Sequence, residues 1–199
     1  MNFISNKILL IIISLISVNI LYFIYVKYNF KFTNEEHIYN PSHSKDYSLE
    51  INLIYIGSSR CVFSNSEILY KTIGSTKLKL QKLSESLGIG FTSIGIAADW
   101  DPIVGIKHLE NIGYFDEVIS GNFWYNNGII KYVGERGNEA STPQIILTFR
   151  TYSEQIKFDV IEEKKILSLN GEYQIINWFN NGAQLPNNFI QEITMIKLK

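Results

Sequence analysis

The feature that most restricts how this chain can fold is a stretch of 19 residues, Ile8 to Val26, without a charged side chain. As an α-helix rising about 1.5 Å per residue, it would span roughly 29 Å, close to the thickness of the bilayer hydrocarbon core. Tyr22 and Tyr25 lie near its end, where aromatic residues favour the membrane interface. We therefore predict one N-terminal transmembrane helix within residues 1–28, followed by a polar linker over residues 29–46.

A cleaved signal peptide is the alternative explanation of the same stretch. The apolar part of such a peptide runs about 7–15 residues and precedes a small-x-small cleavage site. Here the apolar part is longer, and residues 22–27 read Tyr-Phe-Ile-Tyr-Val-Lys, without such a site. We therefore expect an uncleaved single-pass anchor. The short N-terminal tail and the large C-terminal body favour placement of the domain on the periplasmic or extracytoplasmic side.

Beyond residue 46 the hydrophobic pattern alternates between strands and helices. Leu49–Gly57 is rich in β-branched and aromatic residues and ends at glycine, which is typical of a buried strand. Val62–Leu87 repeats apolar residues at spacings of three and four, which predicts an amphipathic helix. The other predicted elements are a strand at 91–98, a helix from an Asp101 N-cap to Gly113, a brief strand at 118–119, a helical or irregular segment at 124–132, strands at 144–149, 155–161 and 165–169, and a helix at 171–180.

The order of these elements predicts the fold class. A strand, a helix and a second strand in succession require a parallel pair joined by a right-handed crossover. The closely spaced strands after Pro143 indicate an antiparallel hairpin, which the last helix then covers. We therefore predict an α/β domain over residues 47–182, with a mixed sheet flanked by helices, and a C-terminal extension over residues 183–199.

Composition excludes several kinds of functional site. The sequence has a single cysteine, which excludes an internal disulfide framework and a cysteine-rich zinc site. His37, His43 and His108 are the only histidines and form no metal-ligand pattern, so we expect neither a metal nor another cofactor. We predict that His108 lies on the surface of its helix. A net charge of -1 gives no general electrostatic reason to bind nucleic acid.

Cys61 is the residue with the most distinctive chemistry. It follows the first strand through Gly57-Ser58-Ser59-Arg60 and is predicted to open the first long helix. The N–H groups and dipole at a helix start stabilise a thiolate, and Arg60 adds a positive charge. Two interpretations remain open, because a free cysteine is also often an inert, buried, small hydrophobic residue.

At these residues the sequence resembles the thioredoxin-like superfamily. The run LIYIGSSRCVFSNSE places Cys61 first in that family's active-site motif, and Ser141-Thr142-Pro143 precedes the strand QIILTF. The resemblance implies a thioredoxin-like domain in which Cys61, Ser64 and Pro143 are catalytic, with Pro143 in the cis form and facing the motif. It also implies that Thr142 contacts the substrate. The second motif cysteine is replaced by Ser64, so a dithiol cycle within the chain is not available.

Two further residues are candidates for substrate binding. Arg60 precedes Cys61 directly, in place of the tryptophan usual in the family. Trp100 lies in the cluster Asp99-Trp100-Asp101 after the predicted second strand, and sites in α/β proteins lie at the carboxyl ends of strands. The competing interpretation, which we favour, is that Asp101 caps a helix and the nearby aromatic residues pack a small core. The whole segment Asp99–Val133 has the length of an insertion.

The sequence thus supports functions of different classes. The first is a monothiol thiol–disulfide exchange protein at the membrane, in which Cys61 attacks a disulfide and an external thiol releases the adduct. The second is a non-catalytic thioredoxin-like binding or scaffold module, which holds an extended peptide beside Pro143 while Cys61 is incidental. The third is a structural subunit. The expected partners are proteins or low-molecular-weight thiols.

Overall fold

A computed structural model describes residues 16–20, 47–135, 137, 139–153, 159–186, 188–190 and 193. The chain divides into two units, residues 1–39 and 40–199. In the first unit, residues 16–20 form a helical turn, whereas the rest of the predicted anchor and the predicted linker lie outside the described residues. No helix among the residues described is long and apolar enough to cross a membrane.

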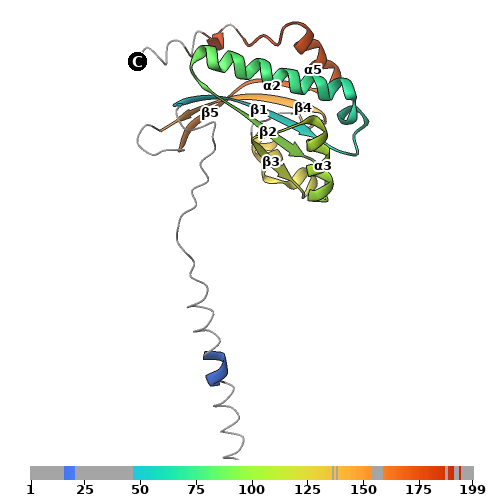
Figure 1. Cartoon of the computed structure of the whole chain (residues 1–199), viewed down its shortest axis with the longest axis vertical. Coiled ribbons are helices and arrows are strands. Elements are labelled where there is room, and N and C mark those ends of the chain that lie inside the picture. The colour runs from blue at the N-terminus through green and yellow to red at the C-terminus, as the bar shows by residue number, and fades with distance from the viewer. Residues whose placement is uncertain are drawn as a thin grey trace, which may run out of the picture. The chain divides into compact units, whose positions relative to one another are not determined.

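A five-stranded mixed sheet forms the centre of the second unit (Figure 1). The strands follow the order β3-β2-β1-β4-β5, with β1 parallel to β2, β2 parallel to β3, and β4 antiparallel to both of its neighbours. The parallel pair and the hairpin predicted from the sequence are confirmed. The strands are β1 (Leu49–Gly57), β2 (Gly90–Ala97), β3 (Glu117–Ser120), β4 (Gln144–Tyr152) and β5 (Val160–Asn170).

The prediction of two separate strands after β4 is wrong, because β5 is one strand from Val160 to Asn170. The charged run Glu162–Lys165 interrupts the apolar pattern but not the pairing of the backbone with β4. Register shifts at Leu147/Thr148 and at Thr151/Tyr152 accommodate the irregularity.

Capping residues define the ends of the main helices. Ser66 accepts a hydrogen bond from the Leu69 N–H and starts α2 (Glu67–Leu87), which ends at Gly88 with φ +61°. Asp101 accepts from Ile103 and Val104 and starts α3, as predicted. The remaining helical segments are α3 (Pro102–Ile112), α5 (Gly171–Asn180) and the short turns η1 (Val62–Asn65), η2 (Phe123–Tyr125), α4 (Asn127–Ile129) and η3 (Ile130–Gly134).

Alternate side chains of β1 enter two cores, one on each face of the sheet. On one face, Leu53 belongs to a core with Leu69 of α2 and Ile175 of α5, the helices drawn together above the sheet in Figure 1. On the other face, Ile54 belongs to a core with Ile129 of α4.

The segments at either side of the predicted domain core contribute to the same architecture. The segment Asp99–Val133 supplies α3 and the edge strand β3. Three described residues of the predicted C-terminal extension, Leu185, Phe189 and Ile193, are buried in the core beneath α2 and α5. A mixed sheet flanked by helices fits the thioredoxin-like α/β fold that the sequence resembles.

Candidate functional site

Cys61 is a half-buried residue in the turn after β1, not the first residue of the long helix. The prediction that it opens that helix is wrong, because Val62–Asn65 forms a separate 3-10 turn and Ser66 caps α2. Asn65 favours this tight turn, since its Nδ2 donates to the carbonyl oxygens of Ser59 at 2.9 Å and of Cys61 at 2.7 Å. The stabilisation of the thiolate therefore has to come from individual hydrogen bonds rather than from the dipole of α2.

The structure brings Cys61 next to the proline loop that precedes β4. The thiol donates a hydrogen bond to the Thr142 carbonyl oxygen, with 3.2 Å between sulfur and oxygen. The Thr142–Pro143 peptide bond is cis, and Pro143 itself is buried. This juxtaposition, over a separation of 81 residues, confirms the geometry that the resemblance implied.

The surroundings of the thiol favour its charged form. Burial raises the pKa of Cys61, but the Ser64 and Thr142 side chains and the backbone N–H groups of Ser64 and Phe63 lower it more. The net pKa is below the ordinary value for a thiol, so a larger fraction of Cys61 is thiolate at neutral pH.

Asp99 holds the loop that leads into Cys61. Its side chain, 2% exposed, accepts hydrogen bonds from the Ser59 hydroxyl at 2.6 Å, the Ser59 N–H at 3.1 Å and the Ser58 hydroxyl at 3.3 Å. The sequence analysis considered only its neighbours Trp100 and Asp101. The available signal was an acidic residue at the end of β2, because β1 and β2 are adjacent and parallel and their carboxyl ends meet at one edge of the sheet.

His108 faces the interior, so its predicted surface position is wrong. Its side chain is 2% exposed because α3 turns the buried positions Gly105, His108, Leu109 and Ile112 toward the sheet. Its Nδ1 lies 3.2 Å from Asn65 Oδ1, and its ring lies 6.3 Å from the ring of Tyr55, centroid to centroid. His108 is therefore part of the surroundings of the Cys61 turn.

Exposed apolar side chains lie on the turn that carries Cys61 and on the neighbouring loop. Val62 and Phe63, the two residues after the thiol, are 82% and 62% exposed. Trp100 is 59% exposed and stacks on Phe123, with 5.3 Å between ring centroids. The interpretation that we favoured for the aromatic residues is thus wrong for Trp100, which stacks at the surface. Arg60 is exposed beside Cys61.

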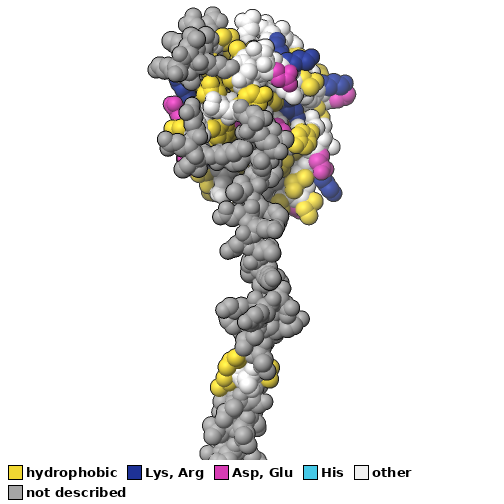
Figure 2. All heavy atoms as spheres, turned by 60° about the vertical axis from the view of Figure 1, so that its left-hand side comes forward, with side chains coloured by type: hydrophobic (Ala, Val, Ile, Leu, Met, Phe, Trp, Pro, Cys, Tyr) yellow, Lys and Arg dark blue, Asp and Glu magenta, His cyan; other side chains and the backbone are white. Residues whose placement is uncertain are grey.

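Charges and potential metal ligands point to no further site of this kind. Acidic and basic side chains are interspersed on the face shown in Figure 2. Within the described part of the chain, no cluster of three or more histidine, cysteine, aspartate or glutamate residues could hold a metal ion.

No family model and no curated protein matches this chain. Among solved structures, it is similar to a thiol:disulfide interchange protein from Bacteroides sp., with 20% identity, a TM-score of 0.36 and coverage of 69% of this chain and 75% of that chain. It is also similar to the thioredoxin domain of a thiol-disulfide oxidoreductase from Bacteroides vulgatus, with 17% identity, a TM-score of 0.35 and coverage of 66% and 78%. A third similar structure is copper-bound Sco1 from yeast, with 15% identity, a TM-score of 0.32 and coverage of 69% and 79%. We therefore base the fold on the strand order and core packing described above.

Proposed function

We propose that this protein is a membrane-anchored, thioredoxin-like protein that exchanges disulfides through the single thiol of Cys61. The observation that carries the proposal is the contact between Cys61 Sγ and the Thr142 carbonyl oxygen, 3.2 Å apart, beside Pro143. It joins a half-exposed thiol, whose pKa is lowered, to the loop that the resemblance assigns to the substrate. In this assignment Cys61 is the nucleophile, Ser64 stabilises its thiolate, and Thr142 and Pro143 contact the substrate.

The proposed reaction is nucleophilic attack by the Cys61 thiolate on one sulfur of a substrate disulfide. A bond forms between Cys61 and that sulfur, the original S–S bond breaks, and the other sulfur leaves as a thiolate and takes up a proton. Ser64 stands where a second thiol would resolve this adduct, and the sequence holds no other cysteine. An external thiol must then attack the mixed disulfide and regenerate Cys61.

The surroundings of Cys61 favour a protein disulfide as the substrate. Val62 and Phe63 extend the site with exposed apolar side chains, which suit an unfolded or extended polypeptide better than a small polar thiol. Arg60 and Trp100 lie on the two loops that Asp99 joins, and in the proposal they flank the bound substrate.

The first test compares the full-length chain with its Cys61→Ser variant. We expect the wild type to react with iodoacetamide at about pH 6, where an ordinary thiol is almost wholly protonated, and to form a mixed disulfide with oxidised glutathione. Cys61→Ser is the blank for both reactions, because the chain has no other thiol. A Cys61 that reacts only after denaturation would contradict the proposal.

The membrane anchor needs a separate test. We expect the full-length chain to stay in the membrane fraction after carbonate extraction, and a variant without residues 1–28 to leave it. A mature wild-type protein that begins near residue 30 and is released would contradict the anchor, while leaving the proposal for Cys61 in place.

A second candidate function rests on the same exposed apolar side chains. In that alternative the domain is a non-catalytic binding module, and Phe63 and Trp100 hold a partner at the membrane. Phe63→Asp would then abolish capture of the partner, whereas Cys61→Ser would leave it unchanged. Loss of capture in Cys61→Ser would instead favour disulfide exchange.

A further inference from the structure

Three polar atoms behind Cys61 are buried without a hydrogen bond to any residue that the structure describes. They are the Tyr55 hydroxyl, the Ser64 hydroxyl and His108 Nε2, contributed by β1, η1 and α3. Buried polar groups are almost always hydrogen-bonded, because desolvation without a partner costs free energy. Three such atoms beside one half-exposed thiol therefore call for an explanation.

These atoms lie close to one another. A Cβ atom at Gly57 would lie 2.3 Å from the Tyr55 hydroxyl and 2.6 Å from His108 Nε2, so these two atoms are at most about 5 Å apart. Burial raises the pKa of Tyr55 while the Ser64 hydroxyl lowers it. At Cys61, too, burial raises the pKa and the Ser64 hydroxyl lowers it. Ser64 therefore acts on both neighbours and connects Cys61 with Tyr55.

The hydrogen bonds of Asn65 define the proton positions on His108. Because Asn65 Nδ2 donates to backbone carbonyl oxygens, its Oδ1 must be the atom that accepts from the Tyr70 hydroxyl at 3.0 Å. The same oxygen lies 3.2 Å from His108 Nδ1, and an oxygen can only accept, so Nδ1 carries the hydrogen. In a neutral imidazole, Nε2 then has a free lone pair, directed into the space that it shares with Tyr55.

We propose that His108 is the proton acceptor of Cys61 and is connected to it through Ser64 and Tyr55. The inference rests on the proposed disulfide exchange, because it describes how the nucleophile of that reaction loses its proton. His108 and Tyr55 act through Ser64 and do not touch the substrate.

The proton balance of this relay is complete. The thiol proton passes to the Ser64 oxygen, the Ser64 proton to the Tyr55 oxygen, and the Tyr55 proton to His108 Nε2. Ser64 and Tyr55 end as neutral hydroxyls, Cys61 as a thiolate and His108 as an imidazolium. After the thiolate has attacked a disulfide, the same chain runs in reverse and returns the proton toward the leaving thiolate.

The groups that face His108 from other elements fit this role. Tyr55 faces it from β1, Tyr70 from α2 with a ring centroid at 6.3 Å, and Asn65 from η1. Burial lowers the pKa of His108, and the negative charge of Asp99, after β2, raises it in part. The imidazole is thus neutral at rest and able to accept a proton, while Asp99 stabilises the imidazolium.

The test is the pH dependence of Cys61 alkylation by iodoacetamide in the full-length protein. We expect Tyr55→Phe and His108→Gln each to raise the apparent thiol pKa by about one unit, which lowers the rate at about pH 6 roughly tenfold. The plateau rate at high pH stays unchanged, because the thiolate itself is unaltered. The double variant should shift the pKa no further than either single variant, since both residues belong to one relay.

The matched controls are other buried hydroxyls. Ser84, near the C-terminal end of α2, is also buried and without a hydrogen bond to a described residue. Ser64→Ala should raise the thiol pKa, whereas Ser84→Ala should not. Proton NMR of His108 adds a reciprocal readout, with two linked titration steps in the wild type and one in Cys61→Ser.

The outcomes separate the relay from the proposed function. An unchanged pH profile in His108→Gln would overturn the relay and leave disulfide exchange by Cys61 intact, even if Tyr55→Phe fails to fold. A wild-type Cys61 that forms no mixed disulfide would overturn the proposed function. A pKa shift of equal size in Ser84→Ala would mark a general effect of destabilisation and overturn the relay.

Discussion

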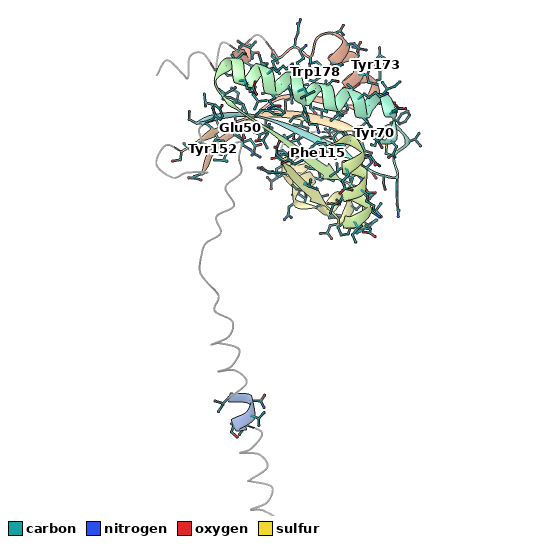
Figure 3. The ribbon with its side chains drawn as sticks, viewed as in Figure 1. Glu50, Tyr70, Phe115, Tyr152, Tyr173 and Trp178 are labelled. Carbon is teal, nitrogen blue, oxygen red and sulfur yellow. The ribbon has the colours of Figure 1, made fainter. Side chains whose placement is uncertain are left out.

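Two groups of buried polar side chains differ in how completely they are paired. The thiol cluster comprises Tyr55, Ser64 and His108, and the charge cluster comprises Glu50, Arg150 and Glu163. Figure 3 shows Glu50 at one end of the sheet and Tyr70, which contacts His108, at the other. In the thiol cluster three polar atoms make no hydrogen bond to a described residue, whereas in the charge cluster each charge meets an opposite charge.

Arg150 is the centre of the charge cluster. Its guanidinium lies 3.3 Å from Glu163 and 3.7 Å from Glu50, and it donates to the Tyr132 hydroxyl at 2.7 Å. Further donors complete the carboxylates: Thr92 and Tyr152 hydrogen-bond Glu50, while Thr148 and Lys131 contact Glu163 at 2.8 and 2.9 Å.

The difference teaches what buried polar atoms do in this fold. A paired buried charge holds its surroundings in one arrangement, since removing either partner leaves the other charge uncompensated. Unpaired hydroxyl and imidazole groups can exchange protons with little rearrangement. We therefore expect the charge cluster to determine stability and the thiol cluster to determine the reactivity of Cys61.

The largest expected effect is on the charge cluster. Arg150→Leu leaves Glu50 and Glu163 without their shared cation and should lower the free energy of unfolding by about 3–5 kcal/mol. Urea denaturation of the full-length protein measures this loss. Arg60→Leu is the matched control, because that arginine is exposed and should change stability by no more than about 0.5 kcal/mol. Equal effects of the two variants would remove the distinction.

The next effect concerns the loop before Cys61. Asp99→Ala removes three hydrogen bonds to Ser58 and Ser59, and we expect a loss of about 2–3 kcal/mol together with slower alkylation of Cys61. Asp101→Ala removes only the N-cap of α3, with an expected loss of about 1 kcal/mol and unchanged alkylation. Both quantities can be followed in the same samples. Unaltered alkylation in Asp99→Ala would show that Asp99 does not position the thiol.

A pair of glycine substitutions tests the packing of the thiol cluster. Gly57→Ala places a methyl group against Tyr55 and His108 and should cost about 1–3 kcal/mol, with a raised thiol pKa. In Gly74→Ala the new methyl group meets no described atom within 4 Å, inside α2, so this variant should stabilise the protein by about 0.5–1 kcal/mol. Thermal denaturation and the alkylation profile check both. A Gly57→Ala protein with normal stability and thiol pKa would contradict the close packing.

The smallest effects are two separate dependences of stability on pH. Burial lowers the pKa of His108, so its contribution is present above the unfolded value of about 6.5 and is lost as the pH falls through the folded value. Burial raises the pKa of Glu163, but Arg150, Lys131 and Thr148 lower it more, so its contribution disappears only below about pH 4.5. Melting curves against pH should lose the first step in His108→Gln and the second in Glu163→Gln. Persistence of either step in its variant would assign it to another group.

The sequence by itself determined the features that depend on neighbours along the chain. The strand pattern of Leu49–Gly57, the Asp101 cap and the Gly88 stop are each read from a few consecutive residues, because helices and turns are stabilised by contacts between residues three or four apart. The resemblance to a known family added the pairing of Cys61 with Thr142 and Pro143. The same local reasoning placed Cys61 on the long helix, because it could not weigh the cap at Ser66 against the turn that Asn65 stabilises.

Only the tertiary structure decided what surrounds the thiol. His108 meets Asn65 across 43 positions of the chain, and Asp99 meets Ser59 across 40. Neither pair follows from periodicity, since an isolated histidine on a helix has the same pattern whether its face is covered or exposed. The sheet covers that face by placing β1 beside β2, and the packing of α3 on this sheet buries His108 behind Cys61.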